Sequence, residues 1–251
     1  MTSGKDDYVN RHYRLSHTGN DLSYFNIRVK ESDLAIGVDK SALTDSLVLL
    51  CQRELTRLRS ELEYYIEMQP EFKTTFVPIE LLTGAPDIAR LMAGAALLAG
   101  VGPMAAVAGA FAQKMGEFLT RYSGEIIVEN GGDIYLCSTQ PRTVAVFAGE
   151  SSFSNQIALK VDSEGRALGI CTSSGTVGPS ISLGKADAVL IRAGSAALAD
   201  AVASRAGNQV QDENDLMKAI EAAREVPGVQ GVLVIKAGKL AAWGDIELIP
   251  I

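Results

Sequence analysis

The chain is 251 residues long and carries 23 Lys and Arg against 30 Asp and Glu, which gives a formal net charge of −7. An acidic chain is poorly suited to neutralise the phosphates of a nucleic acid, so we expect no nucleic-acid partner. Hydrophobic residues make up 47% and charged residues 21%, a composition that predicts a globular protein with a full core and excludes a largely disordered chain.

Histidine and cysteine limit the chemistry further. Both histidines, His12 and His17, lie in the first twenty residues, which argues against a core catalytic triad or a His-ligated zinc site unless the N-terminal arm folds into the site. Cys51, Cys137 and Cys171 are widely spaced, as is typical of reduced thiols. The N-terminus shows no apolar export signal and no lipid-anchoring cysteine, so a cytoplasmic location is expected.

One segment is long and apolar enough to suggest a membrane span. Residues 91–112 contain no charged side chain. They are rich in Ala and Gly, however, and Pro103 follows a break at Gly100-Val101-Gly102. This pattern favours two buried helices joined by a turn, so no membrane partner is expected.

The first half of the chain predicts a hairpin followed by helices. Apolar residues alternate over 25–30 and again over 34–38, which indicates two paired strands. Helical spacing from Ser41 to Ile66 predicts one long amphipathic helix. A second helix is expected to begin at Pro86 or Asp87 and a third at Pro103.

The character of the sequence changes beyond Gly124. Short alternating segments predict an antiparallel meander over 125–130, 133–137, 143–148, 157–161 and 168–171. We then expect a strand over 186–191, helices over 195–206 and 215–224, and paired strands over 229–235 and 239–248. The fold class is therefore α+β, with helices packed on a largely antiparallel sheet. We expect one domain over 1–251, with two closely packed halves, about 1–123 and 124–251, as the alternative.

Two glycine-rich segments are candidate binding sites. The backbone around Gly100 and Gly102, at the start of a helix, could hold a phosphate or carboxylate, although a helix–helix turn explains the same residues. Gly131-Gly132-Asp133 could place a carboxylate and bare backbone beside a ligand, although Gly-Gly between strands is also an ordinary hairpin turn. From these residues alone, the turn is the favoured interpretation of each segment.

Two further segments carry oxygen donors. The stretch Thr172-Ser173-Ser174-Gly175 offers hydroxyls and backbone donors suited to diphosphate or ribityl oxygens, as any polar surface loop would. On the predicted helix over 195–206, Asp200 and Ser204 are four residues apart, so they share a face and could bind a hard cation such as Mg²⁺. A solvated acid and a packing serine explain this pair equally well.

Together these motifs resemble those of ApbE-type flavin transferases. Gly131-Gly132-Asp133-Ile134, the 172–175 loop and Ala199-Asp200-Ala201-Val202-Ala203-Ser204 follow the order of that family's Gly-Gly-Asp-Ile turn, Thr-Ser-Gly loop and Ala-Asp-Ala-x-x-Thr helix. Residues 100–110 and the ending 242–247 resemble an uncharacterised ApbE-like family of bacteria and archaea, over nearly the whole chain.

The resemblance implies a small-molecule ligand, FAD or FMN, together with Mg²⁺. ApbE-type enzymes cleave the FAD diphosphate and attach FMN to a threonine of a target protein. Asp200 and Ser204 would then be catalytic metal ligands, while Gly131, Gly132, Asp133 and the 172–175 loop would bind the flavin nucleotide. Two departures put the transfer activity in doubt: Ser204 stands where threonine is usual, and Pro179 where the closer family usually has histidine.

Two other interpretations stay open. Members of the closer family in methane-producing archaea have been associated with sulfur assimilation into homocysteine, which would make Cys171 a persulfide carrier. For this thiol, burial in an inert environment is the simpler interpretation. The third interpretation is a non-catalytic homologue in which the helix over 41–66 contributes to a homodimer.

Overall fold

The structure is a computed structural model that describes residues 21–175 and 184–251. Its centre is an eight-stranded sheet in which every neighbouring pair is antiparallel, in the order β1-β2-β3-β4-β7-β8-β9-β10. These strands are β1 (Leu22–Val29), β2 (Ser32–Asp39), β3 (Ile126–Asn130), β4 (Asp133–Cys137), β7 (Leu168–Ser173), β8 (Ala188–Ala193), β9 (Val229–Lys236) and β10 (Lys239–Gly244). The predicted antiparallel pairing is confirmed, but the continuous meander over 125–171 is wrong: β4 pairs directly with β7, and the segments predicted at 143–148 and 157–161 pair with each other in a separate sheet. The large sheet takes strands from both halves of the chain.

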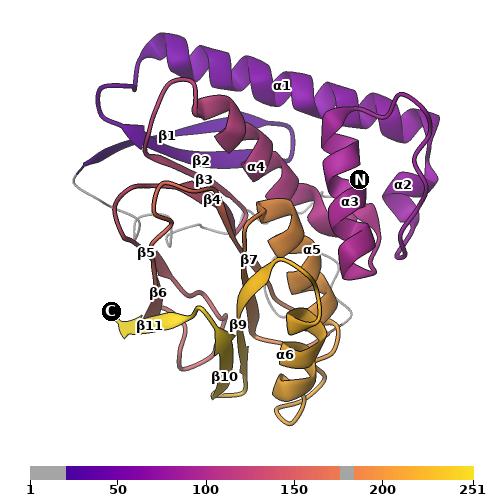
Figure 1. Cartoon of the computed structure of the whole chain (residues 1–251), viewed down its shortest axis with the longest axis vertical. Coiled ribbons are helices and arrows are strands. Elements are labelled where there is room, and N and C mark those ends of the chain that lie inside the picture. Colours follow the sequence, from indigo (N-terminus) through magenta and orange to yellow (C-terminus); the bar gives the residue numbers. More distant parts are fainter. Residues whose placement is uncertain (1–20, 176–183) are drawn as a thin grey trace, which may run out of the picture.

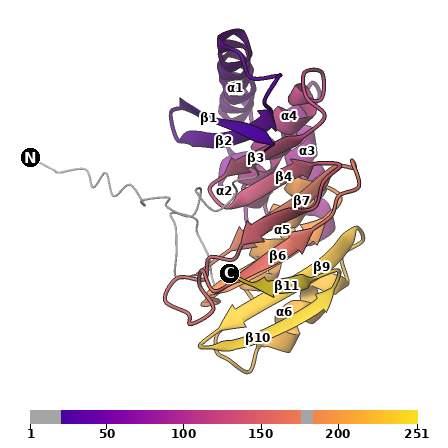
Figure 2. The same cartoon turned by 90° about the vertical axis from the view of Figure 1, so that its left-hand side faces the viewer.

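The large sheet lies between a layer of helices and a smaller sheet (Figures 1 and 2). The helices are α1 (Asp45–Met68), α2 (Glu71–Thr74), α3 (Asp87–Ala99), α4 (Val107–Leu119), α5 (Ala196–Gly207) and α6 (Leu216–Arg224). The smaller sheet has the order β11-β6-β5, from β5 (Arg142–Ala145), β6 (Ile157–Val161) and β11 (Glu247–Pro250). Alternate strand residues, such as Val128 and Ile127, belong to separate apolar cores on the two faces.

The long N-terminal helix begins slightly later than its apolar pattern suggested. Thr44 is the N-cap of α1, and its side chain accepts a hydrogen bond from the backbone amide of Leu47 at 3.1 Å. Capping by a threonine hydroxyl satisfies one of the free amides of the first turn, which explains why the helix starts there and not at Ser41.

One predicted strand is divided in the structure. The segment over 239–248 was expected to be a single strand paired with 229–235, but β10 ends at Gly244 and β11 joins the smaller sheet beside β6. Gly244 has a φ of 74°, and a Cβ atom there would lie 2.2 Å from the carbonyl oxygen of Gln230. Only glycine fits this bend, which redirects the chain from one sheet to the other.

The charge-poor segment forms two helices joined by a turn, as predicted. In the described part of the chain no single helix is long and apolar enough to cross a membrane. The helical segments Asp87–Ala99 and Pro103–Leu119 have sufficient length and apolar composition only as a pair, and the chain bends by 104° between them. A short 3₁₀ helix, Pro103–Ala106, begins the second segment.

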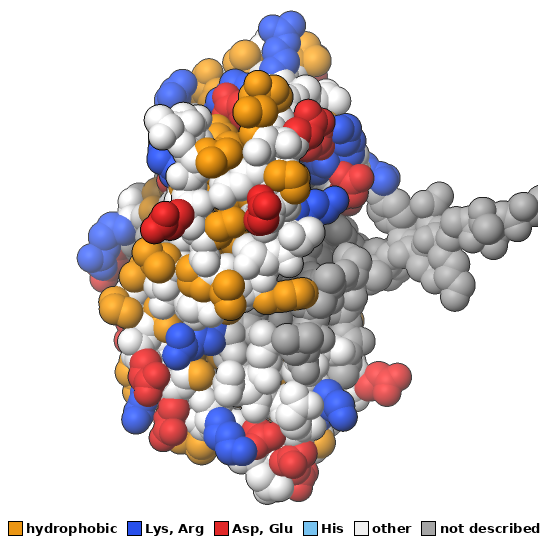
Figure 3. Space-filling view, turned by 90° about the vertical axis from the view of Figure 1, so that its right-hand side faces the viewer, with side chains coloured by type: hydrophobic (Ala, Val, Ile, Leu, Met, Phe, Trp, Pro, Cys, Tyr) orange, Lys and Arg blue, Asp and Glu red, His pale blue; other side chains and the backbone are white. Residues whose placement is uncertain are grey.

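Some apolar side chains of the helical layer remain on the surface. Leu97 and Leu98 of α3 are 68% and 50% exposed, and Phe76 after α2 is 66% exposed. The surface on the side of the molecule where α2 and α3 lie carries hydrophobic side chains interspersed with acidic and basic ones (Figure 3).

Candidate functional site

The Gly131-Gly132 pair is the two-residue turn of the β3–β4 hairpin. Asn130 and Asp133 are register partners, and the two glycines have φ values of 69° and 103°. Positive φ at both central residues is what a primed hairpin turn requires, so the turn interpretation is confirmed. A Cβ atom at either glycine would meet nothing within 4 Å, so the described residues leave open space beside this bare backbone.

Asp133 joins this hairpin to the end of β7. It is 7% exposed, and its Oδ1 accepts a hydrogen bond from the backbone amide of Thr172 at 3.3 Å. The thiol of Cys171 lies beside this carboxylate and influences its pKa. The structure therefore brings the Gly-Gly-Asp turn and the beginning of the 172–175 segment together, although the sequence separates them widely.

Asp200 lies on α5 and reaches the first turn of α4. Its side chain is half-buried, and its Oδ2 accepts the backbone amide of Gly109 at 2.8 Å, with the amide of Ala108 also contributing. The N-cap of α4 is Ala106, which has no side chain able to cap the helix. Asp200 therefore satisfies free amides of α4 from a neighbouring helix. This is a structural role that the sequence pattern did not reveal.

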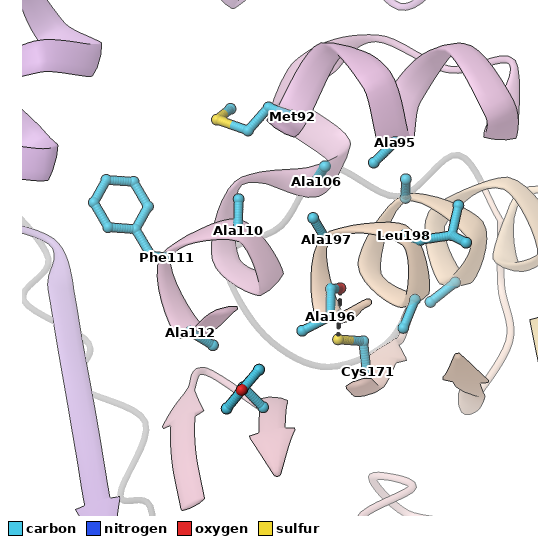
Figure 4. Packing of buried hydrophobic residues seen from close by; sticks show 14 of the residues in the cluster. Met92, Ala95, Ala106, Ala110, Phe111, Ala112, Cys171, Ala196, Ala197 and Leu198 are labelled. Atoms are coloured by element: carbon cyan, nitrogen blue, oxygen red, sulfur yellow. Dashed lines mark hydrogen bonds between the residues drawn. The ribbon is translucent and has the colours of Figure 1, made fainter. Parts of the chain in front are cut away.

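Small residues allow α4 and α5 to approach closely enough for this contact. A Cβ atom on Gly109 would lie 2.3 Å from the carbonyl oxygen of Ala196 and 2.8 Å from the Cβ of Asp200. On the opposite side, a Cβ on Gly169 of β7 would lie 2.4 Å from the Cα of Ala196. Short alanine side chains fill the space between the two helices (Figure 4).

The two aspartates are electrostatically linked. Burial raises the pKa of Asp133 well above its ordinary value, and the charge of Asp200 raises it further, against the influence of the Cys171 thiol and the hydrogen bond from Thr172. Burial also raises the pKa of Asp200 to about 7, although the amides of Gly109 and Ala108 oppose this shift. Among the described residues neither carboxylate forms an ion pair with Lys or Arg. Two carboxylates without a basic partner favour a proton or a bound cation.

The other oxygen donors predicted from sequence, Ser204 and the 172–175 segment, lie near the ends of α5 and β7 and make fewer contacts than Asp133 and Asp200. Ser204, one turn after Asp200 on α5, is half-buried. The position that a Cβ of Gly207 would take is 3.5 Å from the Oγ of Ser173, which places the end of β7 beside the end of α5. Gly175 donates its amide to the carbonyl oxygen of Ala186, and Ser174 also has a partner.

The turn at Gly100 and Gly102 has a structural explanation. Gly100 is the left-handed C-cap of α3, with a φ of 67° and its amide bonded within the helix end. A Cβ on Gly102 would lie 1.9 Å from the carbonyl oxygen of Thr75, so backbone fills the space on that side. The contacts of these glycines are with Thr75, Phe76 and Arg205. The described atoms nearest to the Cβ positions of these two glycines therefore do not belong to Asp133 or to the hairpin turn.

Three residues near the site were not among the ligand-binding or metal-binding residues predicted from sequence. Glu129 is 2% exposed, its Oε1 accepts the amide of Gly132 at 2.8 Å, and its charge adds to the rise in the pKa of Asp133. Asn130 donates to the carbonyl oxygen of Ala108 at 3.1 Å, and Gly109 binds Asp200. Glu129 and Asn130 border the glycine pair, a signal that the sequence did contain. Gly109 belongs to the family-like stretch 100–110, but nothing in that stretch indicated its contact with Asp200.

Cys171 has the environment of an inert thiol. It is fully buried, and its sulfur donates a hydrogen bond to the carbonyl oxygen of Ala196 at 3.2 Å (Figure 4). Burial and the neighbouring charges of Asp133 and Asp200 raise the pKa of this thiol well above its ordinary value. A persulfide carrier needs an accessible thiolate, so these surroundings argue against that role. His12, His17 and Pro179 lie outside the described residues.

The donor set suits a hard cation that keeps part of its own coordination shell. In residues 21–175 and 184–251 no group of three or more His, Cys, Asp or Glu side chains is arranged to hold a metal ion. Mg²⁺, however, is commonly bound by one or two carboxylates, with water and substrate phosphates as its other ligands. The uncompensated pair Asp133 and Asp200 fits that pattern, with Ser204 on the same helix face as Asp200.

Comparisons with known proteins agree with this architecture. The sequence profile of a family described as "AbpE bacteria" matches residues 14–241. A UPF0280 protein of Methanocella arvoryzae is 40% identical over 80% of this chain and 82% of its own length, and one of Methanocaldococcus jannaschii is 36% identical over 88% and 90%.

Solved structures show the same fold at low sequence identity. The apo flavinyl transferase ApbE of Pseudomonas stutzeri matches with a TM-score of 0.60 at 13% identity, covering 89% of this chain and 94% of that one. The flavin transferase ApbE of Vibrio cholerae matches with a TM-score of 0.57 at 13% identity, covering 89% and 97%. The ApbE-like, α+β prediction is therefore confirmed, and the chain belongs to the AbpE bacteria family.

Proposed function

We propose that this protein binds a flavin nucleotide, FAD or FMN, with Mg²⁺ held in part by Asp200, Asp133 and Ser204. The observation that carries the proposal is the pair of electrostatically linked carboxylates, buried Asp133 and half-buried Asp200, without a basic partner among the described residues. Placing two such charges together is unfavourable unless a proton or cation neutralises them. The ApbE fold supports flavin as the ligand class, since the solved relatives include flavin transferases.

The open backbone of the hairpin turn supports a nucleotide beside the carboxylates. Gly131 and Gly132 have no side chains, and no described residue lies within 4 Å of their Cβ positions, so a ligand can approach closely. Thr172 to Gly175, at the end of β7, would contact ligand oxygens next to Asp133. When bound there, Mg²⁺ would neutralise charge on the two phosphates of FAD.

We further propose that the activity, where retained, is transfer of FMN from FAD to a threonine hydroxyl. The bond between the FMN phosphorus and the bridging oxygen breaks, a bond from that phosphorus to the threonine oxygen forms, AMP leaves, and the hydroxyl proton passes to solvent. This chemistry relies on positioning and charge neutralisation, for which a histidine is not required.

Binding is tested by titrating native protein with FAD, FMN and riboflavin, each with and without Mg²⁺, and following flavin fluorescence. Mg²⁺ is expected to tighten binding of FAD and to leave riboflavin unaffected, because riboflavin carries no phosphate. Asp200→Asn and Asp133→Asn are expected to remove the effect of Mg²⁺. Asp39→Asn is the matched control, because the Asp39 carboxylate also accepts backbone amides, those of Gly124 and Glu125, and it lies at the end of β3 opposite the hairpin turn. Absence of any FAD or FMN binding would overturn the proposal.

Transfer is tested separately. The protein is incubated with FAD, Mg²⁺ and a threonine-bearing acceptor peptide, and released AMP is measured together with the mass of the peptide. AMP release with a matching gain of mass on the peptide supports transfer. Tight FAD binding without AMP release contradicts the transferase proposal and leaves flavin binding intact.

A further inference from the structure

Asn130 connects the glycine hairpin to α4. It is the last residue of β3, directly before Gly131, and it is 9% exposed. Its Nδ2 donates a hydrogen bond to the carbonyl oxygen of Ala108 at 3.1 Å. Asp133 is its register partner across the hairpin. One buried amide therefore connects the strand pair that carries Asp133 to the first turn of α4.

The same turn of α4 holds Asp200. The backbone amide of Gly109 donates a hydrogen bond to the Asp200 carboxylate, with a distance of 2.8 Å from the Gly109 nitrogen to Oδ2. Asn130 thus binds the carbonyl group of the peptide unit that joins Ala108 to Gly109, while Asp200 binds the N–H group of the same peptide unit. Because Ala106 has no capping side chain, the orientation of this turn depends on contacts from outside the helix.

We propose that Asn130 is a positioning residue that sets the Asp200 carboxylate relative to Asp133 for cation binding. It does so through the Ala108–Gly109 turn and does not touch the cation. The inference rests on the proposed function for the identity of the cation. Residues that orient metal ligands through hydrogen bonds typically change metal affinity by about 10-fold to 100-fold when removed.

The test compares Asn130→Ala with Gln113→Ala. Gln113 lies on α4, and its Oε1 accepts the Ser195 hydroxyl at 2.8 Å and the Ala197 amide at 3.3 Å, so it also connects α4 to α5. Its loss removes a comparable contact between the helices without touching the Ala108–Gly109 turn. Asn130→Asp is the second variant, because it keeps the shape of the side chain and loses the amide donor.

Two quantities are measured. The first is the dissociation constant for Mg²⁺ alone by calorimetry, which is expected to rise about tenfold in Asn130→Ala and Asn130→Asp and to stay unchanged in Gln113→Ala. The second is amide hydrogen exchange of Gly109 in metal-free protein, which is expected to quicken in the Asn130 variants only.

The outcomes separate this inference from the proposed function. Failure of the wild-type protein to bind Mg²⁺ counts against the proposed function, while Gly109 exchange still reports whether Asn130 orders the turn. Wild-type Mg²⁺ binding with unchanged affinity and exchange in the Asn130 variants overturns the positioning role. Equal weakening in Gln113→Ala also overturns it, because the effect would then arise from general helix packing.

Discussion

Gly109 of α4 lies directly against the backbone of Ala196 at the start of α5. A Cβ atom on Gly109 would lie 2.3 Å from the Ala196 carbonyl oxygen and 2.8 Å from the Cβ of Asp200. The obstructing atoms belong mainly to the backbone of a buried helix, so they cannot move as a flexible side chain would. The position of Asp200 therefore depends on the absence of a side chain at residue 109.

Gly109→Ala is expected to separate the two helices and destabilise the protein by about 1–3 kcal/mol, the usual cost of overpacking. It should also weaken Mg²⁺ binding, because the amide of residue 109 would move away from Asp200. Chemical denaturation measures the first effect and calorimetry the second. Gly94→Ala on α3 is the control: nothing lies within 4 Å of its Cβ position, so a gain of about 0.5–1 kcal/mol is expected.

Stability should depend on pH through Asp200. Its pKa is raised to about 7 from the ordinary 3.8, so between these values the folded protein holds a proton that the unfolded chain releases. The stabilisation from this group is complete below the ordinary pKa and is lost as the pH rises through about 7. The Tm of metal-free protein is therefore expected to fall from about pH 5 to pH 8, and Asp200→Asn should flatten this dependence.

Added Mg²⁺ supplies the complementary measurement. It should raise the Tm more at about pH 8 than at pH 5, because Asp200, with a pKa of about 7, is mostly ionised only at the higher pH. Both histidines are retained in Asp200→Asn, so their titration cancels in the comparison. An identical pH slope in wild type and Asp200→Asn would contradict the assignment.

Arg142 is the centre of a second charged cluster, away from the candidate site. It forms a bidentate ion pair with Asp21 at 2.9 and 2.7 Å, a further one with Glu125 at 2.6 Å, and is 8% exposed. Arg142→Met would leave Glu125 buried and unpaired, at an expected cost of about 3 kcal/mol in urea denaturation. Arg57→Met is the control, since the Arg57 side chain is exposed while it pairs with Glu54 and Glu61, and the expected change is below about 1 kcal/mol.

The ion pair between Arg142 and Glu125 also predicts how the stability of the protein changes in acid. Hydrogen bonds from Ser138 and Thr139 and from Arg142 outweigh burial and lower the pKa of Glu125 to about 2. Its stabilisation is present above the ordinary value of 4.5 and is lost as the pH falls through about 2. Arg142→Met should show a shallower loss of stability in this range.

The three cysteines should differ in their reaction with a thiol reagent. Cys137 is half-buried, whereas Cys51 and Cys171 are fully buried, and burial raises the pKa of all three thiols. Labelling followed by mass spectrometry is expected to modify Cys137 slowly in native protein and the other two only on unfolding. Rapid native labelling of Cys171 would instead revive the persulfide interpretation.

The sequence by itself determined the local elements and much of the family assignment. Alternation over 25–30 and 34–38, the paired glycines at 131–132 and Pro103 are signals within a few residues, and each predicts a strand pair, a turn or a helix start. The order of the Gly-Gly-Asp, Thr-Ser-Ser-Gly and Ala-Asp-Ala motifs pointed to the ApbE-like family, and the family match agrees.

The tertiary structure determines which of these sequence segments lie side by side. The amide of Thr172 bonds Asp133 and the amide of Gly109 bonds Asp200, contacts between segments far apart in the chain. The turn at Gly100 and Gly102 looked similar in sequence, yet it packs against Thr75. A local sequence pattern reflects only the interactions of a residue with its near neighbours in the chain. The pairing of two carboxylates arises from the close packing of α4, α5 and β7, which depends on side chains missing at Gly109 and Gly169.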